Sequence, residues 1–440
     1  MSGVPAANRR GAELGLGLLA VIVAAFGYLL VQLAQKPDVP PDLWVIFAAV
    51  LALFVVAHLA VRRLAPDANQ VLLPIAALLN GLGFVTVARL DSNLGRIQAA
   101  WTAVSVLAFV LTLVGVRRIR DLERYRYSFL FLGMVALLLP LAPGLGKTIN
   151  GARLWVGVGP VNFQPGEAAK VFLVLFFAAY LVDKRELLAS GGRRIGRMML
   201  PEPKHLGPLL LAWGVSILIM VRETDLGQAM LIFALCGVML YVATERAAYT
   251  VVTVVLFVTA AGIAYQLFGH VQTRVQIWID PFKYANDKGY QLVQSLFGFA
   301  AGGFAGTGLG LGSPKQIPNV ATDFVFSAIG EELGLLGCVA VLVALLLFVG
   351  SGYQIAVRSE RPFPKLFATG LTTIIGIQSF VIIGGVTRVI PLTGVTLPFI
   401  SYGGSSLLAN WVILALLLRI SDDNAQGTQA RRPGRTARAP

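Results

Sequence analysis

Long, uninterrupted apolar segments recur along the chain and divide its charged residues into short clusters. Each segment is roughly 17 to 25 residues long, the length that an α-helix needs to cross the hydrocarbon core of a bilayer. The apolar residues are consecutive rather than alternating with polar ones, which excludes a membrane β-barrel. Only 13% of the residues are charged, whereas soluble proteins carry about 25%. The sequence therefore predicts an all-α polytopic membrane protein.

About twelve membrane helices are predicted by this criterion. They lie at residues 13–34, 42–61, 71–88, 97–116, 127–142, 167–183, 207–221, 226–244, 248–267, 324–350, 366–389 and 396–419. The first follows two arginines but has no small-residue cleavage site near its end, so we interpret it as a membrane helix rather than a signal peptide. Residues 421–440 are rich in Arg, Gly, Gln, Ala and Pro, a composition typical of a disordered basic tail.

The net charge of +14 is explained by membrane topology, without nucleic-acid binding. Most of the 36 Lys and Arg residues fall in loops on one side of the predicted bundle. Because cytoplasmic loops carry an excess of positive charge, we expect that side, with both termini, to be cytoplasmic. The external loops are then 144–166, 222–227, 269–323 and 388–406. Both cysteines fall within apolar segments, which argues against a disulfide or a metal site.

The longest interval without a membrane-length apolar segment runs from Gly269 to Glu332. Its cations alternate with aromatic residues, which suits an amphiphile with an anionic head group, such as a lipid diphosphate. The ordinary alternative is a solvated loop with interfacial aromatics. Asp323 lies at the head of the next membrane helix, and Glu331 and Glu332 lie about two turns deeper. Burying a carboxylate at this depth in the membrane costs free energy, so a functional role is the default explanation for these residues.

Asp323 is the leading candidate for a catalytic residue. Glycosyl transfer to a sugar hydroxyl requires a base against the acceptor and positive charge near a leaving diphosphate. Asp323 is suited to be that base, or to hold a divalent cation, Mg²⁺ or Mn²⁺, against the phosphates. Capping of the following helix is its structural alternative, and one Asp can serve in both ways.

Other external segments carry further candidates. Arg153 and Trp155 place a cation beside an indole, which alternatively is an ordinary interfacial anchor. Glu167 and Lys170 are three residues apart at the start of a helix, so they share a face and form either a structural ion pair or part of a site. Asp225 alternatively caps the helix that follows it.

The segment from Arg388 to Ser406 interrupts a membrane span with two prolines and several glycines and hydroxyl groups. Irregular backbone at membrane depth is tolerated only where it is buried in protein or lines a cavity. We therefore expect this segment to be a re-entrant wall of the same external site.

The run Pro398-Phe-Ile-Ser-Tyr-Gly-Gly-Ser-Ser-Leu-Leu408 resembles the signature of the shape, elongation, division and sporulation (SEDS) family, the RodA- and FtsW-type proteins. Further stretches agree in order and spacing, namely Asn150–Trp155 with Phe163–Lys170, Thr224–Gly227, and Thr322–Phe326 with Gly330–Gly334. The resemblance covers residues 71–420. It implies a bundle of ten core helices with a large extracellular loop, 268–322, before the eighth.

This resemblance implies a peptidoglycan glycosyltransferase that polymerises lipid II on the outer face of the bacterial cytoplasmic membrane, for cell elongation and shape or for division. Such enzymes release undecaprenyl diphosphate, use no nucleotide-sugar cofactor and work with a class B penicillin-binding protein. The family's catalytic Asp corresponds to Asp323, although Ala321 stands where the family has a His. The family's Trp, Glu and Lys correspond to Trp155, Glu167 and Lys170.

The resemblance and the sidedness together give a set of candidate substrate contacts. For the diphosphate these are Arg153, Arg222, Arg274, Lys283 and Arg388, and Trp155 is a candidate for lipid or sugar packing. The remaining candidates are Glu167, Lys170, Asp225, Ser401 and Tyr402, with Glu331 and Glu332 as structural groups near the site.

Residues 13–62 form a predicted helix pair outside the family core, after a cytoplasmic N-terminus of residues 1–12. Such an extension, together with the basic tail, resembles actinobacterial members, and we expect the elongation branch of the family. Partners implied are the elongation or division machinery and membrane lipid, but not nucleic acid.

A lipid II flippase is the main alternative, since Glu167, Lys170, Glu331 and Glu332 suit a translocation path. A flippase requires polar residues on both membrane faces, however, and here they cluster outside. The sequence also lacks an obvious inverted repeat. A catalytically silent scaffold of the cell-wall machinery is a third hypothesis, which leaves the buried carboxylates unexplained.

Overall fold

The computed structural model describes residues 6–35, 43–149, 152–158, 161–190, 193–195, 198–200, 203–222 and 225–430. Within these ranges ten helices are long and apolar enough to cross a membrane, and two apolar helices are shorter. The long helices are α1 (Ala6–Gln35), α2 (Leu43–Leu64), α3 (Leu72–Leu90), α4 (Ser92–Gly115), α7 (Pro165–Ser190), α9 (Leu226–Thr244), α10 (Ala247–Leu267), α13 (Val325–Arg358), α14 (Pro362–Val386) and α15 (Gly404–Ala430). The shorter ones are Arg126–Leu141, which covers α6 (Arg126–Leu138) and the turn after it, and Leu210–Ile219 within α8 (Pro203–Arg222). Each predicted segment coincides with one of these helices, and the all-α polytopic fold is confirmed.

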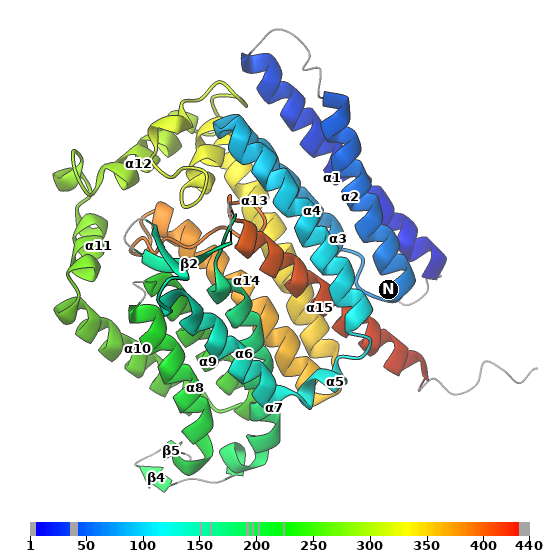
Figure 1. The fold of residues 1–440 in the computed structure, drawn as a ribbon, viewed down its shortest axis with the longest axis vertical. Coiled ribbons are helices and arrows are strands. Elements are labelled where there is room, and N and C mark those ends of the chain that lie inside the picture. Colours follow the sequence, from blue (N-terminus) through cyan, green and yellow to red (C-terminus); the bar gives the residue numbers. More distant parts are fainter. Residues whose placement is uncertain are drawn as a thin grey trace, which may run out of the picture.

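The bundle is built around α7, α14 and α15, whose residues are mostly buried. α14 packs between α13, α7 and α9, and α15 packs against α4 and α7. α1 and α2 lie together at one edge, against α3 and α4, while α8, α10 and α11 form the opposite side (Figure 1). α10 is almost entirely exposed. Its apolar surface is therefore suited to contact lipid or another membrane helix.

Short strands occupy two of the loops. β1 (Gly146–Ile149), β2 (Ala152–Val158) and β3 (Val161–Phe163) form a three-stranded antiparallel sheet between α6 and α7. β4 (Arg193–Ile195) pairs with β5 (Met198–Leu200) between α7 and α8. A helix of one turn, α5 (Arg120–Glu123), and a 3-10 turn, η1 (Leu139–Leu141), flank α6. The sheet gives the loop before α7 an ordered backbone that the sequence analysis did not predict.

The large loop between α10 and α13 contains secondary structure of its own. It holds α11 (Gly269–Ile279), η2 (Phe282–Tyr284), α12 (Tyr290–Gly302) and η3 (Pro314–Gln316). α12 buries Leu292 and Val293 and packs on α13. Glycines with positive φ follow α12, including Gly306 and Gly310, where a side chain would be strained. The loop therefore folds back onto the start of α13 rather than extending away from the bundle.

Two predicted boundaries at the C-terminal end of the chain are wrong. α15 begins at Gly404 rather than near residue 396, because the preceding segment is irregular. α15 also continues to Ala430, so residues 421–430 are helical and not part of a disordered tail. Side chains in this extension bind other elements: Asn424 Nδ2 donates to the Ile355 carbonyl (3.1 Å) and to Ser359 Oγ (2.8 Å). Residues 431–440 lie outside the described ranges.

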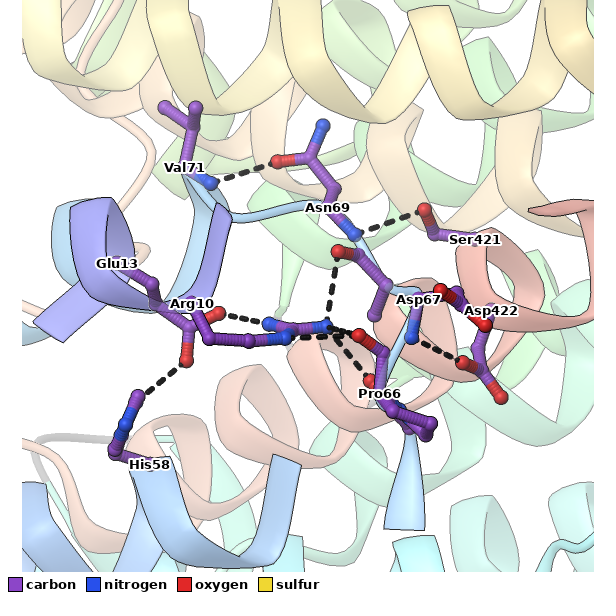
Figure 2. Close-up of polar contacts among 11 residues, drawn as sticks. Arg10, Glu13, His58, Pro66, Asp67, Asn69, Val71, Ser421 and Asp422 are labelled. Atoms are coloured by element: carbon purple, nitrogen blue, oxygen red, sulfur yellow. Dashed lines mark hydrogen bonds and ion pairs between the residues drawn. The ribbon is translucent and has the colours of Figure 1, made fainter. Parts of the chain in front are cut away.

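Polar contacts fix the N-terminal helix pair to the start of the core (Figure 2). Arg10 donates to the carbonyls of Ala65, Pro66 and Ala68, which join α2 to α3, and it pairs with Glu13. The fully buried Glu13 also contacts His58 Nδ1 of α2 (2.8 Å).

The same connection between α2 and α3 is bound by α15. The backbone N–H of Asp67 donates to Asp422 Oδ1 (2.8 Å), and that of Asn69 donates to Ser421 Oγ (3.0 Å). We call this set of contacts the anchor cluster; it lies at the end of the bundle where α1 begins and α15 ends (Figure 1).

Candidate functional site

The segment between α14 and α15 has irregular backbone and is docked on the turn that precedes α13. Positive φ values occur at Arg388 (63°), Gly394 (78°) and Phe399 (65°). Ser401 Oγ donates to the Thr322 carbonyl (2.5 Å), and the Tyr402 N–H donates to the Ala321 carbonyl (2.8 Å). Ser401 through its hydroxyl group and Tyr402 through its backbone N–H therefore hold the segment beside Asp323.

Asp323 lies in that turn, at the end of the bundle opposite the anchor cluster. α13 is capped by Phe324, without a side-chain hydrogen bond, so the carboxylate of Asp323 is not used as a helix cap. The backbone N–H of Asp323 donates to the Asn319 carbonyl (3.1 Å). The side chain is partly buried. The capping alternative is thus not realised, and the carboxylate is left for another role.

Arg274 of α11 reaches the same place from the large loop. Its Nη1 donates to the carbonyls of Thr393 (2.8 Å) and Leu392 (3.2 Å). A Cβ on the neighbouring Gly394 would lie 3.8 Å from Asp323 Oδ2 and 4.0 Å from Arg274 Nη2. The cation and the carboxylate therefore flank one exposed glycine whose backbone is in the left-handed region.

Two carboxyl groups near Arg274 have raised pKa values. Burial raises the pKa of Asp323 to about 6, while hydrogen bonding from Thr322 and the charge of Arg274 act in the opposite direction. Burial likewise raises the pKa of Asp225 to about 6, opposed by the Gln228 N–H that Asp225 caps (3.0 Å). Burial also lowers the pKa of Arg274, and both carboxylates oppose this. Such carboxyl groups are able to exchange protons near neutral pH.

A buried polar network lies next to Asp225. Lys170 Nζ is 2.9 Å from Glu167 Oε2, and both side chains are at most 3% exposed. Gln228 Nε2 donates to Glu167 Oε1 (2.6 Å), and Lys170 donates to Gln378 Oε1 (3.0 Å). Gln378 in turn donates to the Thr396 carbonyl (2.8 Å). This network joins α7, α9 and α14 to the irregular segment. It therefore helps to hold in place the segment that lies beside Asp323.

Three predicted diphosphate ligands are placed differently. Arg153 Nη2 donates to the Ala142 carbonyl (3.1 Å). Arg388 donates to the carbonyls of Trp278 (2.8 Å) and Ile279 (2.5 Å), and Trp278 Nε1 donates back to the Arg388 carbonyl (3.1 Å). Lys283 is exposed, with its Nζ 5.9 Å from the centre of the Tyr284 ring. None of these three contacts Asp323, and the side chain of Arg222 lies outside the described residues.

Trp155 is partly buried within β2, opposite Lys147 in the strand register. Three residues of the sequence motifs, Asn150, Gly151 and Thr224, lie outside the described ranges.

Glu331 and Glu332 hold the glycine-rich part of the large loop. Glu331 Oε1 accepts from the Ser313 N–H (2.5 Å), and Glu332 Oε2 accepts from the Gly310 N–H (3.1 Å). Glu332 also pairs with Arg89 of α3 (3.0 Å). These carboxylates therefore have structural partners, in agreement with a supporting role and not with a free polar path.

The sequence analysis missed Gln228, Gln378 and Gly394. The two glutamines are uncharged, so a search for charges within apolar segments passed over them, although an amide inside a membrane helix is itself a signal. Within the described ranges there is no group of three or more His, Cys, Asp or Glu side chains that could hold a metal ion.

Comparisons with known proteins show the family of the chain. Residues 69–426 match the FtsW/RodA/SpoVE family of cell cycle proteins. The chain is 44% identical to "Peptidoglycan glycosyltransferase RodA" of Mycobacterium tuberculosis, over 98% of this chain and 93% of that protein. It is 35% identical to "Probable peptidoglycan glycosyltransferase FtsW" of Geobacter sp. (strain M18), over 66% of this chain and 77% of that protein.

Two solved structures are also similar. A chain from "Structural coordination of polymerization and crosslinking by a peptidoglycan synthase complex" matches with a TM-score of 0.68 and 28% identity, over 81% of this chain and 98% of that one. RodA of Thermus thermophilus matches with a TM-score of 0.55 and 27% identity, over 81% and 97%. The mycobacterial match confirms the expected actinobacterial kinship. The chain belongs to the FtsW/RodA/SpoVE family, which is the SEDS family indicated by its sequence motifs.

Proposed function

We propose that this chain polymerises lipid II into glycan strands, with Asp323 as the catalytic base. It is a peptidoglycan glycosyltransferase, the activity named for relatives that are 44% identical over nearly the whole chain. The observation that carries the assignment is the uncapped carboxylate of Asp323 beside the guanidinium of Arg274. A base and a cation at one place are what transfer from a lipid diphosphate requires.

In this reaction the Asp323 carboxylate accepts the proton of the acceptor sugar hydroxyl. The hydroxyl oxygen then forms a bond to the anomeric carbon of the donor, and the bond from that carbon to the diphosphate oxygen breaks with inversion. Undecaprenyl diphosphate leaves with the electron pair. Arg274 stabilises the developing negative charge, because Nη1 is fixed by two carbonyls while Nη2 lies near Gly394, on which Asp323 Oδ2 also borders.

A divalent cation fits this site only with help from the substrate. Asp323 supplies one carboxylate, and Mg²⁺ or Mn²⁺ in such sites is bound by one or two carboxylates together with substrate phosphates and water. A cation held in this way would neutralise the leaving diphosphate. The chain's own contribution remains the position of Asp323 and the charge of Arg274.

The site would lie on the outer face of the bacterial cytoplasmic membrane, with both termini in the cytoplasm. The Lys- and Arg-rich loops support this orientation through the positive-inside rule. A class B penicillin-binding protein is the proposed partner, supported by the similar chain in a complex that coordinates polymerisation and crosslinking. Identity to RodA proteins supports the elongation branch.

The structure gives no support to the flippase alternative. Glu167 pairs with Lys170, and Glu332 pairs with Arg89. Glu331 binds the backbone of the large loop. These groups hold elements together instead of lining a path, and the curated relatives carry the name of the transferase.

The first test compares Asp323→Asn with the wild-type protein, purified with its penicillin-binding partner and supplied with labelled lipid II and Mg²⁺ or Mn²⁺. Loss of a positioned base lowers rates by about 10²- to 10⁴-fold, so glycan polymer on a gel should disappear. Asp91→Asn is the matched control, because Asp91 is exposed and caps α4, a role that Asn fills equally well. Normal polymerisation by Asp323→Asn would exclude this residue as the base.

A further inference from the structure

A cavity of about 840 Å³ lies between the N-terminal helix pair and the family core. Its walls come from α1, α2, α3 and α4, and Trp411 of α15 also lines it. The walls are mainly apolar, with residues such as Val21, Phe54, Phe84 and Val106. None of its lining residues belongs to the Asp323 site. The volume is in the range of ligand pockets, roughly 300 to 1,000 Å³.

The cavity opens sideways toward the surroundings of the bundle. Ala52 and Val56 of α2, and Ala99 and Ala103 of α4, line it and are exposed. These helices lie at the edge of the bundle, where a spanning protein meets the hydrocarbon of the bilayer (Figure 1). An apolar cavity does not retain ordered water, whereas hydrocarbon chains fill it favourably. The opening is therefore placed for an acyl chain to enter from the membrane.

The end of the cavity nearest the Asp323 end of the bundle is polar. Gln32, Ser92 and Arg96 line it there. Arg96 is exposed and has no ion-pair or hydrogen-bond partner among the described residues. Asp91 does not neutralise it by contact, because its carboxylate accepts from the Asn93 and Leu94 N–H groups. A cation above an apolar slot matches a lipid phosphate above its acyl chains.

We propose that this cavity binds one anionic phospholipid of the membrane leaflet next to the Asp323 site, with its phosphate at Arg96 and its acyl chains between α2 and α4. The length of the cavity favours a phospholipid over a polyprenyl carrier. From Ser92 to Val106, α4 rises about 21 Å, somewhat more than one leaflet of hydrocarbon at about 15 Å. That depth accommodates an acyl chain, whereas a much longer polyprenyl chain would extend beyond it.

The bound lipid would act on the site through α3 and α4. Asn80 of α3 accepts from Trp411 Nε1 (3.4 Å) and donates to Thr102 Oγ1 of α4 (3.3 Å), and all three line the cavity. On the side of the irregular segment, Gln98 Nε2 of α4 donates to the Ser401 carbonyl (3.4 Å). Ser401 binds the turn that carries Asp323. Lipid in the cavity would thus hold α3 and α4 in place, and α4 contacts the irregular segment between α14 and α15.

The test measures lipid binding by the purified full-length protein, stripped of lipid and then supplied with phosphatidylglycerol, phosphatidylcholine or undecaprenyl phosphate. Native mass spectrometry should detect one retained phosphatidylglycerol per chain, and this lipid should raise the unfolding temperature most, because a ligand of the folded state stabilises it. Arg96→Gln should weaken phosphatidylglycerol binding about fivefold.

A matched pair of variants locates the binding. Ala103→Trp fills the cavity and should abolish retention, while Val104→Trp places the same ring on an exposed position of α4 outside the lining and should not. Equal retention in both variants, or equal affinity in Arg96→Gln and wild type, would overturn the proposal. A preference for undecaprenyl phosphate would refute the phospholipid assignment. If Ala103→Trp does not fold, Arg96→Gln still decides, since that side chain is exposed.

Discussion

At the scale of single residues, Arg274 is the cation shared by the two carboxyl groups of the site. It is the cation whose charge opposes the burial of Asp323, and it also acts on Asp225. Asp225 and Asp323 come from different elements and have similar raised pKa values, about 6 each. Burial is the main cause of both raised pKa values, and Arg274 is the cation that opposes it at both carboxyl groups.

The polymerisation rate should rise with pH through about 6. A base is active only when it is deprotonated, and burial raises the pKa of Asp323 to about 6, so the rate should fall as pH decreases below that value and level off above about 7. Initial rates of lipid II consumption between pH 5 and pH 8 measure this. Asp225→Asn should retain the transition, because Asn preserves the cap of α9. Loss of the transition in that variant would assign it to Asp225 instead.

Arg274→Gln should move the same transition to higher pH. Removing the positive charge removes an influence that lowers the pKa of Asp323, so the carboxyl would stay protonated to a higher pH. The maximal rate should fall as well, because the leaving diphosphate loses a stabilising cation. A pH–rate profile of this variant beside the wild type separates the two effects. An unshifted midpoint with normal maximal rate would remove Arg274 from the site.

At the scale of elements, the position of the irregular segment between α14 and α15 depends on close backbone packing against α3. A Cβ on Gly83 of α3 would lie 2.4 to 2.9 Å from the backbone O, Cα and C atoms of Ile400. Backbone atoms cannot move aside to relieve such a clash, whereas the end of a flexible side chain can. Only glycine at this position lets α3 support the segment that includes Ser401.

Gly83→Ala should therefore destabilise the protein by about 1 to 3 kcal/mol, the usual range for overpacking. It should also lower activity, because the segment beside Asp323 must shift. Thermal unfolding and polymerisation assays test both effects. Gly262→Ala in α10 is the control, since a Cβ there meets nothing within 4 Å and alanine favours the helix. Equal stability of the two variants would contradict the close packing of α3 on Ile400.

At the scale of the whole molecule, buried charges join the N-terminal helix pair to the core. Glu13 is fully buried between Arg10 and His58, and Arg10 binds three carbonyls of the connection between α2 and α3. The helix pair precedes the part of the chain that matches the family model. The mycobacterial relatives match over this part too, since 98% of the chain is covered.

Glu13→Gln should lower the thermal unfolding midpoint clearly. Removing one partner of a buried ion pair costs about 3 to 5 kcal/mol, because the remaining charge is left without compensation. Asp121→Asn is the matched control, since Asp121 and Arg120 form an exposed pair that contributes little. A midpoint as high as that of the wild type in Glu13→Gln would show that the anchor cluster is dispensable for stability.

The number and order of the membrane helices were predictable, since length and hydropathy decide which segments cross a bilayer. The start of α15 was not, because residues 395–400 are mostly apolar and raise hydropathy without forming a helix. The helical extension to Ala430 depends on partners such as Ile355 and Ser359, which are distant in sequence.

For the site, motifs and sidedness identified Asp323, Arg274 and the Glu167–Lys170 pair. Sidedness did not distinguish a cation that faces the site from one bound to nearby carbonyls, as Arg153 and Arg388 are. That difference depends on backbone geometry that composition does not record. Gln378, which accepts from Lys170, was missed for a different reason, because it carries no charge.

The contacts of α15 also have a consequence for the order of events during synthesis. Arg419 donates to the carbonyls of Leu64, at the end of α2, and Leu113, near the end of α4 (2.6 Å each). These earlier helices leave the ribosome long before Arg419 does. The carbonyls of Leu64 and Leu113 therefore lack these hydrogen bonds until the last helix is inserted. A chain truncated before Arg419 should be degraded by membrane proteases, even though its other helices are inserted in the membrane.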